Sequence, residues 1–520
     1  MAIVWADLRC GCGGWIGWHC TESSAPPAWP ASARYQWGSW YAYGPGVTAA
    51  VLQRELELLS ARFADLGPWQ FLVDAGWHLQ YGRDDAELGV VDFEKFPAGV
   101  RGVADTAHAI GLKVLLYLGL GFIHDSPADG GEWLALKGLI ERHPDWLLPF
   151  QTEPSPVRRF LLDFGKEEVR AHIGELIRDY FEVHAADGIL VDGLADAEGQ
   201  LIPRQERDAR DGPPHPLLPG LDIYRLIRTE AERHRPDPFI VSGWVNPTAA
   251  NPHVDIYFYA DEAAQVDSPY PFGGFLQHLD YALFSQIALG QRAYAGASSG
   301  DPLLPEARWW VQAGAALGAP ATLGTRLERM DAQTVAGFRA DLLALNPYEG
   351  STTYGPGFPP DTFATTRNGL TYLGVVNREA RGRPMDVDLG ALGLGSEAYT
   401  ALDITTGEGR RVAGVLSVEL PARSFRLLVL RKEPGVLWTD SVVAVTLRGD
   451  SLSATARGPA SVPGFLHMTV PPPSAVSLDG VPLSRAASPR PGAAFSYDDA
   501  SGVLSLEYAH TAERRIEARW

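Results

Sequence analysis

Three aspartates, Asp74, Asp192 and Asp261, each stand where a short apolar segment ends, and their carboxylates are the groups of this chain best suited to chemistry. Two carboxylates about 5 Å apart can cleave a glycosidic bond with retention, because one attacks the anomeric carbon while the other protonates the leaving oxygen. Carboxylates also cap helices and bind divalent ions such as Mg²⁺. The three residues alone therefore leave a glycosidase, a set of helix caps and a metal site as alternatives.

The segment that ends in Asp192 indicates which elements would position such a carboxylate. Residues 189–191 form an apolar run of strand length, and amphipathic helical patterns lie before it at 167–185 and after it at 221–234. Helix, buried strand, acidic residue and helix is the repeating unit of a parallel β/α protein. The C-terminal strand ends of a β/α barrel carry its chemistry. Position alone therefore supports two interpretations of Asp192 about equally: a catalytic residue, and a residue that caps the next helix or fixes a turn.

The same alternation of strands and helices runs from residue 35 to residue 346. We predict eight strands, at Trp37–Tyr43, Phe71–Asp74, Val114–Leu118, Ile189–Val191, Phe239–Ser242, Ile256–Ala260, Ala293–Ala297 and Ala321–Gly324. A short extra strand is predicted at 160–163, in the long insertion after the third strand. Eight strands with intervening helices predict an α/β fold, a (β/α)8 TIM barrel with insertions.

The regions outside this barrel have different sequence patterns. Residues 1–34 are rich in Gly, Trp and Pro without periodicity, which predicts an irregular lead-in. After residue 346, short alternating strands replace the helical pattern. They predict an antiparallel β domain over 347–435 and a second small β-sandwich over 436–520. The catalytic domain is therefore expected to be the barrel, 35–346.

Composition excludes several classes of partner. The 520-residue chain has a formal net charge of -19, which argues against a nucleic-acid-binding face and against binding to anionic membranes. No apolar run reaches the ~18 residues that a transmembrane helix needs, and the N-terminus has no signal-peptide pattern. Fifteen Trp and eighteen Tyr residues suit the stacking of sugar rings, although large cores use them too.

Three cysteines, Cys10, Cys12 and Cys20, lie near the N-terminus. With His19 they could imitate a metal site, but their spacing fits no zinc pattern well. Free thiols in a reducing cytoplasm are the favoured interpretation. We therefore expect a cytoplasmic protein with no metal and no cofactor.

Several short motifs occur in an order that carries a family resemblance. Along the chain they are Trp37–Tyr43 with Val47-Thr48, Asp74-Ala75-Gly76-Trp77, Gly111-Leu112-Lys113, His143-Pro144-Asp145-Trp146, and Leu162-Asp163 with Glu168-Val169-Arg170. Over residues 35–432 this set resembles glycoside hydrolase family 36, the α-galactosidases of clan D. No single motif is decisive, and the resemblance rests on their order.

The resemblance implies roles for two of the three aspartates. Asp192 falls where the family has its nucleophile, and Asp261 falls where it has its acid/base. Asp196 is the rival nucleophile, and Glu262 and Asp267 are the rival acids.

Further residues are candidates for contact with the substrate. The candidate contacts are Trp40, Asp74, Trp77, Tyr117, Arg159 and Trp244. Arg158 is the alternative to Arg159, and Asp301 is one more candidate. For each aromatic residue, packing at the barrel mouth is the alternative.

The chain departs from the family pattern at the sugar subsite. Ala75, Leu190, Val241 and Tyr257 stand where the family has polar groups that hold the reacting sugar. A site built to bond a hydroxyl discriminates through that bond, so the sugar preference is expected to change. The family's large N-terminal β-sandwich is also missing, so a homo-oligomer like the family's tetramer stays an open question.

Together these patterns predict a retaining α-glycoside hydrolase, most similar to α-galactosidases. It is expected to act on oligosaccharides or glycosides by double displacement, through a covalent glycosyl-aspartate intermediate. α-N-Acetylgalactosaminides and α-glucosides are alternative substrates. A transglycosidase of the same fold and a non-catalytic glycan-binding protein on a degenerate barrel are the alternative functions.

Overall fold

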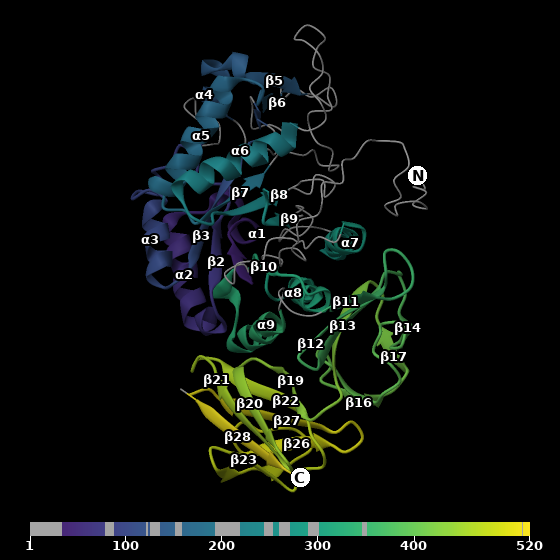
Figure 1. The fold of residues 1–520 in the computed structure, drawn as a ribbon. Coiled ribbons are helices and arrows are strands. Elements are labelled where there is room, and N and C mark those ends of the chain that lie inside the picture. The colour runs from purple at the N-terminus through teal and green to yellow at the C-terminus, as the bar shows by residue number, and fades with distance from the viewer. Residues whose placement is uncertain are drawn as a thin grey trace.

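Three units follow one another along the chain: a parallel β/α unit, an antiparallel β unit and a β-sandwich (Figure 1). The computed structural model describes residues 34–78, 88–120, 123–124, 136–150, 159–192, 219–243, 253–258, 271–289, 301–345, 351–511 and 513–520.

Parallel strands form the central sheet, in the order β10-β1-β2-β3-β7-β8-β9. Their bounds are β1 Tyr35–Gly38, β2 Trp69–Val73, β3 Lys113–Gly119, β7 Gly188–Asp192, β8 Phe239–Gly243, β9 Ile256–Phe258 and β10 Ala321–Leu323. Because β1 pairs with both β2 and β10, the last of these strands lies beside the first and the sheet curls back on itself. This order confirms the predicted barrel fold; the predicted strand Ala293–Ala297 lies outside the described residues.

Helices accompany these strands, and Figure 1 shows α2, α3, α5 and α6 along one side of the sheet. The longer helices are α2 Ala49–Phe63, α3 Arg101–Ala109, α5 Glu167–Glu182, α6 Pro219–His234, α7 Pro271–Leu289, α8 Pro305–Leu317 and α9 Ala332–Ala344, and short 3₁₀ helices lie at Gly44–Gly46, Ala64–Leu66, Pro144–Trp146 and Leu327–Arg329. The Thr48 side chain caps α2 by accepting a hydrogen bond from Val51 N, and Leu52, Leu56 and Leu59 form its buried stripe. These local signals made the helix predictable from the sequence.

The prediction of a first strand over Trp37–Tyr43 is wrong at its C-terminal end. β1 stops at Gly38, and Trp40–Tyr43 forms the short helix α1. Ser39 N donates to Leu72 O (3.2 Å), and Tyr43 N then donates back to Ser39 O (2.9 Å). The aromatic residues here have a high β propensity, but the backbone turns into a helix once it passes the end of the sheet.

The insertion after β3 contains a small antiparallel sheet in the order β4-β6-β5. Its strands are β4 Ile123–His124, β5 Leu147–Phe150 and β6 Arg159–Leu162, and helix α4 is Lys137–Arg142. β6 confirms the predicted extra strand to within one residue.

The N-terminal end of β7 is fixed by the buried carboxylate of Asp187. Its Oδ2 accepts hydrogen bonds from Val114 N (2.7 Å) and His108 Nε2 (2.8 Å), while its Oδ1 accepts from Lys113 Nζ (3.1 Å) and from Arg235. These groups come from α3, β3 and the end of α6, so one side chain joins three neighbouring elements at the end of the barrel that does not carry the chemistry.

The second unit is a six-stranded antiparallel sheet, β11-β12-β13-β18-β15-β16, with a two-stranded sheet, β14-β17. Its strands are β11 Ser351–Tyr354, β12 Thr362–Arg367, β13 Leu370–Asn377, β14 Arg383–Asp388, β15 Tyr399–Asp403, β16 Gly409–Val412, β17 Val415–Leu420 and β18 Ser424–Arg431. It joins the barrel at α8, where Thr352 Oγ1 donates to Leu317 O (3.0 Å) and Thr365 Oγ1 donates to Ala316 O (2.8 Å).

The third unit consists of two five-stranded sheets, β19-β22-β27-β26-β25 and β20-β21-β28-β23-β24. Its strands are β19 Gly435–Thr439, β20 Val442–Arg448, β21 Ser451–Arg457, β22 Pro463–Thr469, β23 Ala475–Leu478, β24 Val481–Pro482, β25 Ser484–Arg485, β26 Ala494–Asp498, β27 Val503–Ala509 and β28 Arg514–Arg519. Buried Arg339 of α9 attaches this unit to the barrel, since its Nε donates to Asp440 O (3.0 Å) while its terminal nitrogens bind both carboxylate oxygens of Asp65.

Candidate active site

Asp74 and Asp192 lie at the same end of the parallel sheet. Asp192 is the last residue of β7, and Asp74 directly follows β2. β3 lies between these strands, with Val73 opposite Leu116 and Asp192 opposite Gly119. Because the strands are parallel, both carboxyl groups lie at the C-terminal mouth of the barrel.

The strand register also places the two carboxyl groups on one face of the sheet. Partners in neighbouring strands share a face, and so do alternate residues of one strand. Leu72 of β2 pairs with Leu115 of β3, and Tyr117 of β3 pairs with Leu190 of β7. Each aspartate lies two residues beyond one of these leucines, so both share the face of Tyr117.

The backbone around Asp74 is held by Ser39. Ser39 Oγ accepts a hydrogen bond from Asp74 N (2.9 Å), and Asp74 Oδ1 accepts one from Ala75 N (2.7 Å). Ser39 is fully buried and Asp74 is 8% exposed. The loop after β1 therefore positions the residue at the end of β2.

The electrostatics of the mouth set Asp74 apart from an ordinary surface carboxylate. Burial raises the pKa of Asp74 to about 7; the hydrogen bond from Ala75 N opposes this rise, and the nearby charge of Asp192 adds to it. Two carboxyl groups that interact in this way bind a proton more readily than either would alone. At neutral pH the pair therefore holds one negative charge more easily than two.

The hydroxyl of Tyr117 reaches the level of Asp192. A Cβ atom added to Gly119, the strand partner of Asp192, would lie 2.7 Å from the Tyr117 hydroxyl oxygen. A glycine is therefore needed where the phenol ring passes. Tyr117 is 1% exposed, and its carbonyl oxygen accepts a hydrogen bond from Tyr180 Oη of α5 (2.9 Å).

Trp77 is buried in the wall behind the mouth. Its ring centroid lies 3.7 Å from that of His78 and 5.4 Å from those of Tyr180 and His184. Its side chain is fully buried. The described structure thus places the Trp77 ring between the end of β2 and α5, away from solvent.

Trp40 begins α1, directly beyond the C-terminal end of β1, and packs partly buried against the main core. Arg159 lies in β6, where it pairs with His124 and Phe150, and its side chain lies outside the description. Asp261 and Trp244 lie outside the described residues, as do Asp196, Glu262, Asp267 and Arg158.

Three supporting residues were not predicted from the sequence: Ser39, His78 and Tyr180. His78 Nε2 lies 2.9 Å from Tyr180 Oη, so the two form a buried chain that ends at the Tyr117 carbonyl. Burial lowers the pKa of His78 to about 3, and the charge of His184 adds to this. Ser39 lies inside the predicted strand Trp37–Tyr43, so only the structure shows that it follows the end of β1. Nothing local marks Tyr180.

Among the described residues, no group of three or more His, Cys, Asp or Glu side chains could hold a metal ion. The Cys10, Cys12, Cys20 and His19 segment lies outside those residues. No helix in the part of the chain that the structure describes is long and apolar enough to span a membrane.

Comparison with curated proteins gives similarity over one stretch. No protein-family model matches the chain. Over 87 residues, 16% of the chain, it is 38% identical to a protein of Neosartorya fischeri named "Probable alpha-galactosidase B" and 37% identical to the protein of that name in Aspergillus clavatus. The match covers 20% and 19% of these relatives, so the chain spans about a fifth of their length.

Comparison with solved structures gives similarity over most of the chain. A family 27 β-L-arabinopyranosidase of Geobacillus stearothermophilus, in complex with arabinose, aligns with a TM-score of 0.57 at 17% identity, over 78% of this chain and 98% of its own. α-Galactosidase I of Mortierella vinacea aligns with a TM-score of 0.50 at 14% identity, over 77% and 97%. The fold is therefore that of α-galactosidase-like glycoside hydrolases. The arabinopyranosidase is named as a family 27 enzyme, and these similarities do not support family 36 specifically.

Proposed function

We propose that this protein is a retaining α-glycosidase whose preferred substrates are α-galactosides. The observation that carries the proposal is the pair of electrostatically coupled carboxyl groups, Asp74 and Asp192, on one face at the C-terminal mouth of the barrel. The relatives named as α-galactosidases support the substrate class.

In the proposed reaction, a carboxylate oxygen of Asp192 attacks the anomeric carbon. The bond to the leaving oxygen breaks as that oxygen takes a proton from Asp261. Water then gives its proton back to Asp261 while its oxygen displaces Asp192, so the configuration is retained after two inversions. Besides the substrate and water, these steps use two side chains, Asp192 and Asp261, and Asp261 lies outside the described residues.

Asp74 is proposed to hold the reacting sugar. With a pKa near 7 it can accept a hydrogen bond from a hydroxyl group or donate one, according to its protonation state. The Tyr117 hydroxyl, which lies beside Gly119, is proposed to contribute a second contact.

Two finer assignments belong to the proposal. The motif order favours family 36 within clan D, although the similar solved structures include members of family 27. Leu190 and Val241 pair across β7 and β8 and are both buried, so they present an aliphatic wall below Asp192 where the family has polar groups. That wall favours a sugar held mainly from the side of β2 and β3.

A fluorinated glycosyl donor that traps the covalent intermediate tests the nucleophile. We expect peptide mapping to place the label on Asp192, and we expect Asp192→Asn to lose turnover by at least about 10⁴-fold, since an amide cannot form the ester. Asp105→Asn, an exposed position on α3, is the matched control. A label on Asp196 would overturn the assignment.

Matched aryl α-galactoside, α-glucoside and α-N-acetylgalactosaminide substrates test the sugar. We expect the galactoside to have the highest kcat/KM of the three. An advantage above about 100-fold, which corresponds to about 2.7 kcal/mol of transition-state binding, would show that other residues replace the missing polar groups. Equal turnover of all three substrates would contradict the proposed preference for galactosides but would still support glycosidase activity.

A further inference from the structure

The hydroxyl group of Tyr180 joins the two elements that carry the proposed sugar contacts. Tyr180 belongs to α5, and its side chain is fully buried. Its Oη donates to Tyr117 O of β3 (2.9 Å) and lies 2.9 Å from Nε2 of His78, which follows Asp74 in the loop after β2. One phenol therefore contacts both the strand of Tyr117 and the loop of Asp74.

The direction of these two hydrogen bonds follows from the groups involved. The Tyr117 carbonyl oxygen can only accept, so the single hydroxyl proton of Tyr180 is used there. The His78 ring must then donate from Nε2 to the Tyr180 oxygen. Burial lowers the pKa of His78 to about 3. At neutral pH the ring is therefore uncharged and carries one proton, which this arrangement places on Nε2.

The backbone of β3 shows why the Tyr117 carbonyl needs a partner. Just past the end of β3, Leu120 N donates to Asp192 O of β7 (3.0 Å). Near the start of β3, Val114 O accepts from Asp187 N (2.7 Å), which directly precedes β7. The even-numbered residues from 114 to 120 thus direct their backbone groups toward β7. Alternate residues of a strand bond to opposite sides, so the carbonyl of Tyr117 points toward β2.

Strand β2 ends too early to bind that carbonyl. Its last pair with β3 lies one residue before Tyr117. Beyond that pair, the N–H of Asp74 donates to Ser39 Oγ (2.9 Å), and the N–H of Ala75 donates to the Asp74 carboxyl group (2.7 Å). Both N–H groups therefore donate to groups outside β3, and a buried carbonyl left without a donor would cost free energy. The Tyr180 hydroxyl takes the place of the missing strand.

The early end of β2 also frees the loop of Asp74 from the sheet. Hydrogen bonds of the ladder no longer fix the spacing between this loop and β3. The chain of hydrogen bonds from His78 through Tyr180 to Tyr117 connects the two instead. A shift of about 1 Å in a group that positions a substrate can lower activity by about 10²-fold. The spacing that this chain fixes is therefore large in its consequences for activity.

We propose that Tyr180 is a positioning residue for the sugar subsite, which sets the separation between the Asp74 carboxyl group and the Tyr117 hydroxyl through its two hydrogen bonds. Because Tyr180 is fully buried, it acts without touching the substrate. The inference rests on the proposed function, in which these two groups hold the reacting sugar. His78 is the second positioning residue, since it links the hydroxyl to the loop of Asp74.

Tyr180→Phe tests the proposal, because it keeps the buried ring and removes both hydrogen bonds. We expect the variant, with folding checked by near-UV circular dichroism, to lose at least about tenfold in kcat/KM for an aryl α-galactoside. In an Asp74→Asn background the same substitution should lose less than about threefold, since the separation matters only while both contacts exist. A merely structural role would give the same fold-loss in both backgrounds.

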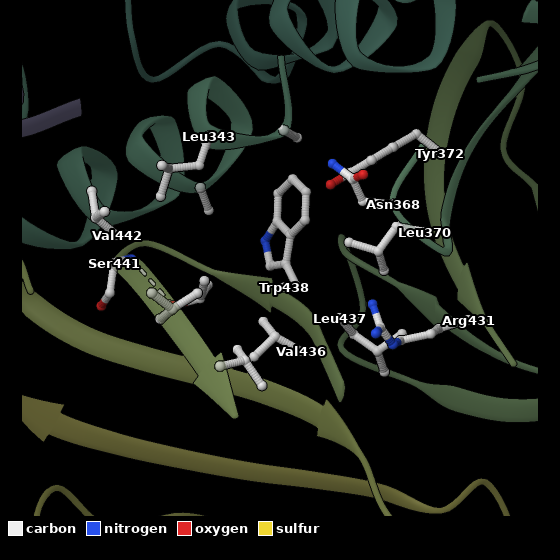
Figure 2. Close-up of a pocket in the computed structure, with 15 residues that line it drawn as sticks. Leu343, Asn368, Leu370, Tyr372, Arg431, Val436, Leu437, Trp438, Ser441 and Val442 are labelled. Carbon is white, nitrogen blue, oxygen red and sulfur yellow. Dashed lines mark hydrogen bonds between the residues drawn. The ribbon is translucent and has the colours of Figure 1, made fainter. Parts of the chain in front are cut away.

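Tyr508→Phe is the matched control for the loss of a buried phenol. Tyr508 is 1% exposed, and its hydroxyl lies 2.7 Å from Ser441 Oγ. Figure 2 shows Ser441 next to Val442, at a cavity that is also lined by Leu343 of α9. Arg34, which directly precedes β1, donates to Leu343 O (3.3 Å), so this cavity lies at the end of the barrel opposite the mouth. Tyr508→Phe should therefore leave kcat/KM unchanged.

Variants of His78 test the other end of the chain and serve also if Tyr180→Phe does not fold. His78→Leu removes the donor and should lose at least about tenfold in kcat/KM, as Tyr180→Phe does. His78→Gln can donate from about the position of Nε2 and should retain more activity than His78→Leu. Equal activity of these two variants would contradict a role for the hydrogen bond.

Nitrogen-15 NMR of the whole protein with labelled histidine gives a readout that needs no turnover. The His78 signals, assigned by their absence in His78→Leu, should show a neutral ring protonated at Nε2 at pH 7. Tyr180→Phe should shift the Nε2 signal, and Tyr508→Phe should not. A ring protonated at Nδ1, or an unchanged signal in Tyr180→Phe, would overturn the inference.

Failure of this inference differs from failure of the proposed function. If the unmodified protein hydrolyses α-glycosides while Tyr180→Phe keeps its kcat/KM, or loses equally in both backgrounds, the positioning role is wrong and the proposed function stands. If the unmodified protein turns over no α-glycoside, the proposed function is wrong and the positioning role is overturned with it.

Discussion

The two ends of strand β7 carry carboxyl groups in opposite environments. Asp187 precedes the strand at its N-terminal end, and Asp192 closes it at the C-terminal end. Both positions border the same buried run, Ile189 to Val191. The difference between them lies in the groups that the fold brings to each.

At the N-terminal end, the charge of Asp187 is compensated. Burial alone would raise its pKa, but the hydrogen bonds from Val114 N, His108 and Lys113, with the charge of Arg235, lower the pKa below its usual value. Such a carboxylate stabilises the fold in its charged form. This end of the barrel is built for stability.

At the C-terminal end, the charge that acts on Asp74 is that of another carboxyl group, Asp192. Asp74 accepts a hydrogen bond from Ala75 N, yet its pKa is raised to about 7 by burial and by Asp192. Holding a charge there costs folding free energy, and that arrangement is typical of sites that perform chemistry. The comparison teaches that similar strand ends can be built either to stabilise the fold or to react.

The largest expected effect comes from Asp187→Asn. It leaves Lys113 and Arg235 without their anion and should lower the free energy of unfolding by about 2–4 kcal/mol at pH 7. Because the pKa is lowered in the folded state, the contribution is present above the unfolded pKa of about 3.9 and is lost as the pH falls through the folded value. Urea unfolding at pH 7 measures the loss.

The activity of Asp187→Asn sharpens the comparison. Turnover per folded molecule should be unchanged, since the side chain lies at the end of the barrel away from the mouth. If fully folded Asp187→Asn loses kcat, the N-terminal end of the barrel also affects the reaction, and the contrast between a stabilising end and a reactive end is wrong.

Asp74→Asn should raise the free energy of unfolding at neutral to basic pH, whereas Asp187→Asn should lower it. The raised pKa means that the folded state binds the proton more tightly, so stability falls as the pH rises from about 4 to about 7. The amide removes this cost and should stabilise the protein by about 1–3 kcal/mol at pH 8, with little effect at pH 4. Urea midpoints at the two pH values measure it.

The same variant should lose activity on the order of tenfold or more, because the sugar contact changes. A variant that is more stable and less active is the result expected if the buried Asp74 carboxyl group serves activity at the expense of stability. If Asp74→Asn lowers the free energy of unfolding equally at both pH values, then the charged Asp74 carboxylate does not destabilise the folded protein, and the interpretation is wrong.

His108→Gln should have the smallest effect. The glutamine can still donate toward Asp187 from α3, and Val114, Lys113 and Arg235 remain. We expect a loss of about 1 kcal/mol or less at pH 7, measured by urea unfolding. An effect as large as that of Asp187→Asn would mean that His108 alone stabilises the buried charge of Asp187.

The sequence by itself determined the kinds of element and their order. Apolar runs such as Ile189 to Val191 between helical patterns are local signals, and so is the Thr48 cap, so the barrel and the end positions of Asp74 and Asp192 followed from them. The change to alternating strands after residue 346 was equally local.

The tertiary structure decided which side chains meet. The sequence pattern continued the first strand to Tyr43, but the end of the sheet stops it at Gly38. Pairing between strands put Tyr117 on the face of the two carboxyl groups, and packing against α5 buried Trp77. Register, burial and the neighbours that set the pKa of Asp74 depend on residues far apart in the chain, so only the folded structure could fix them.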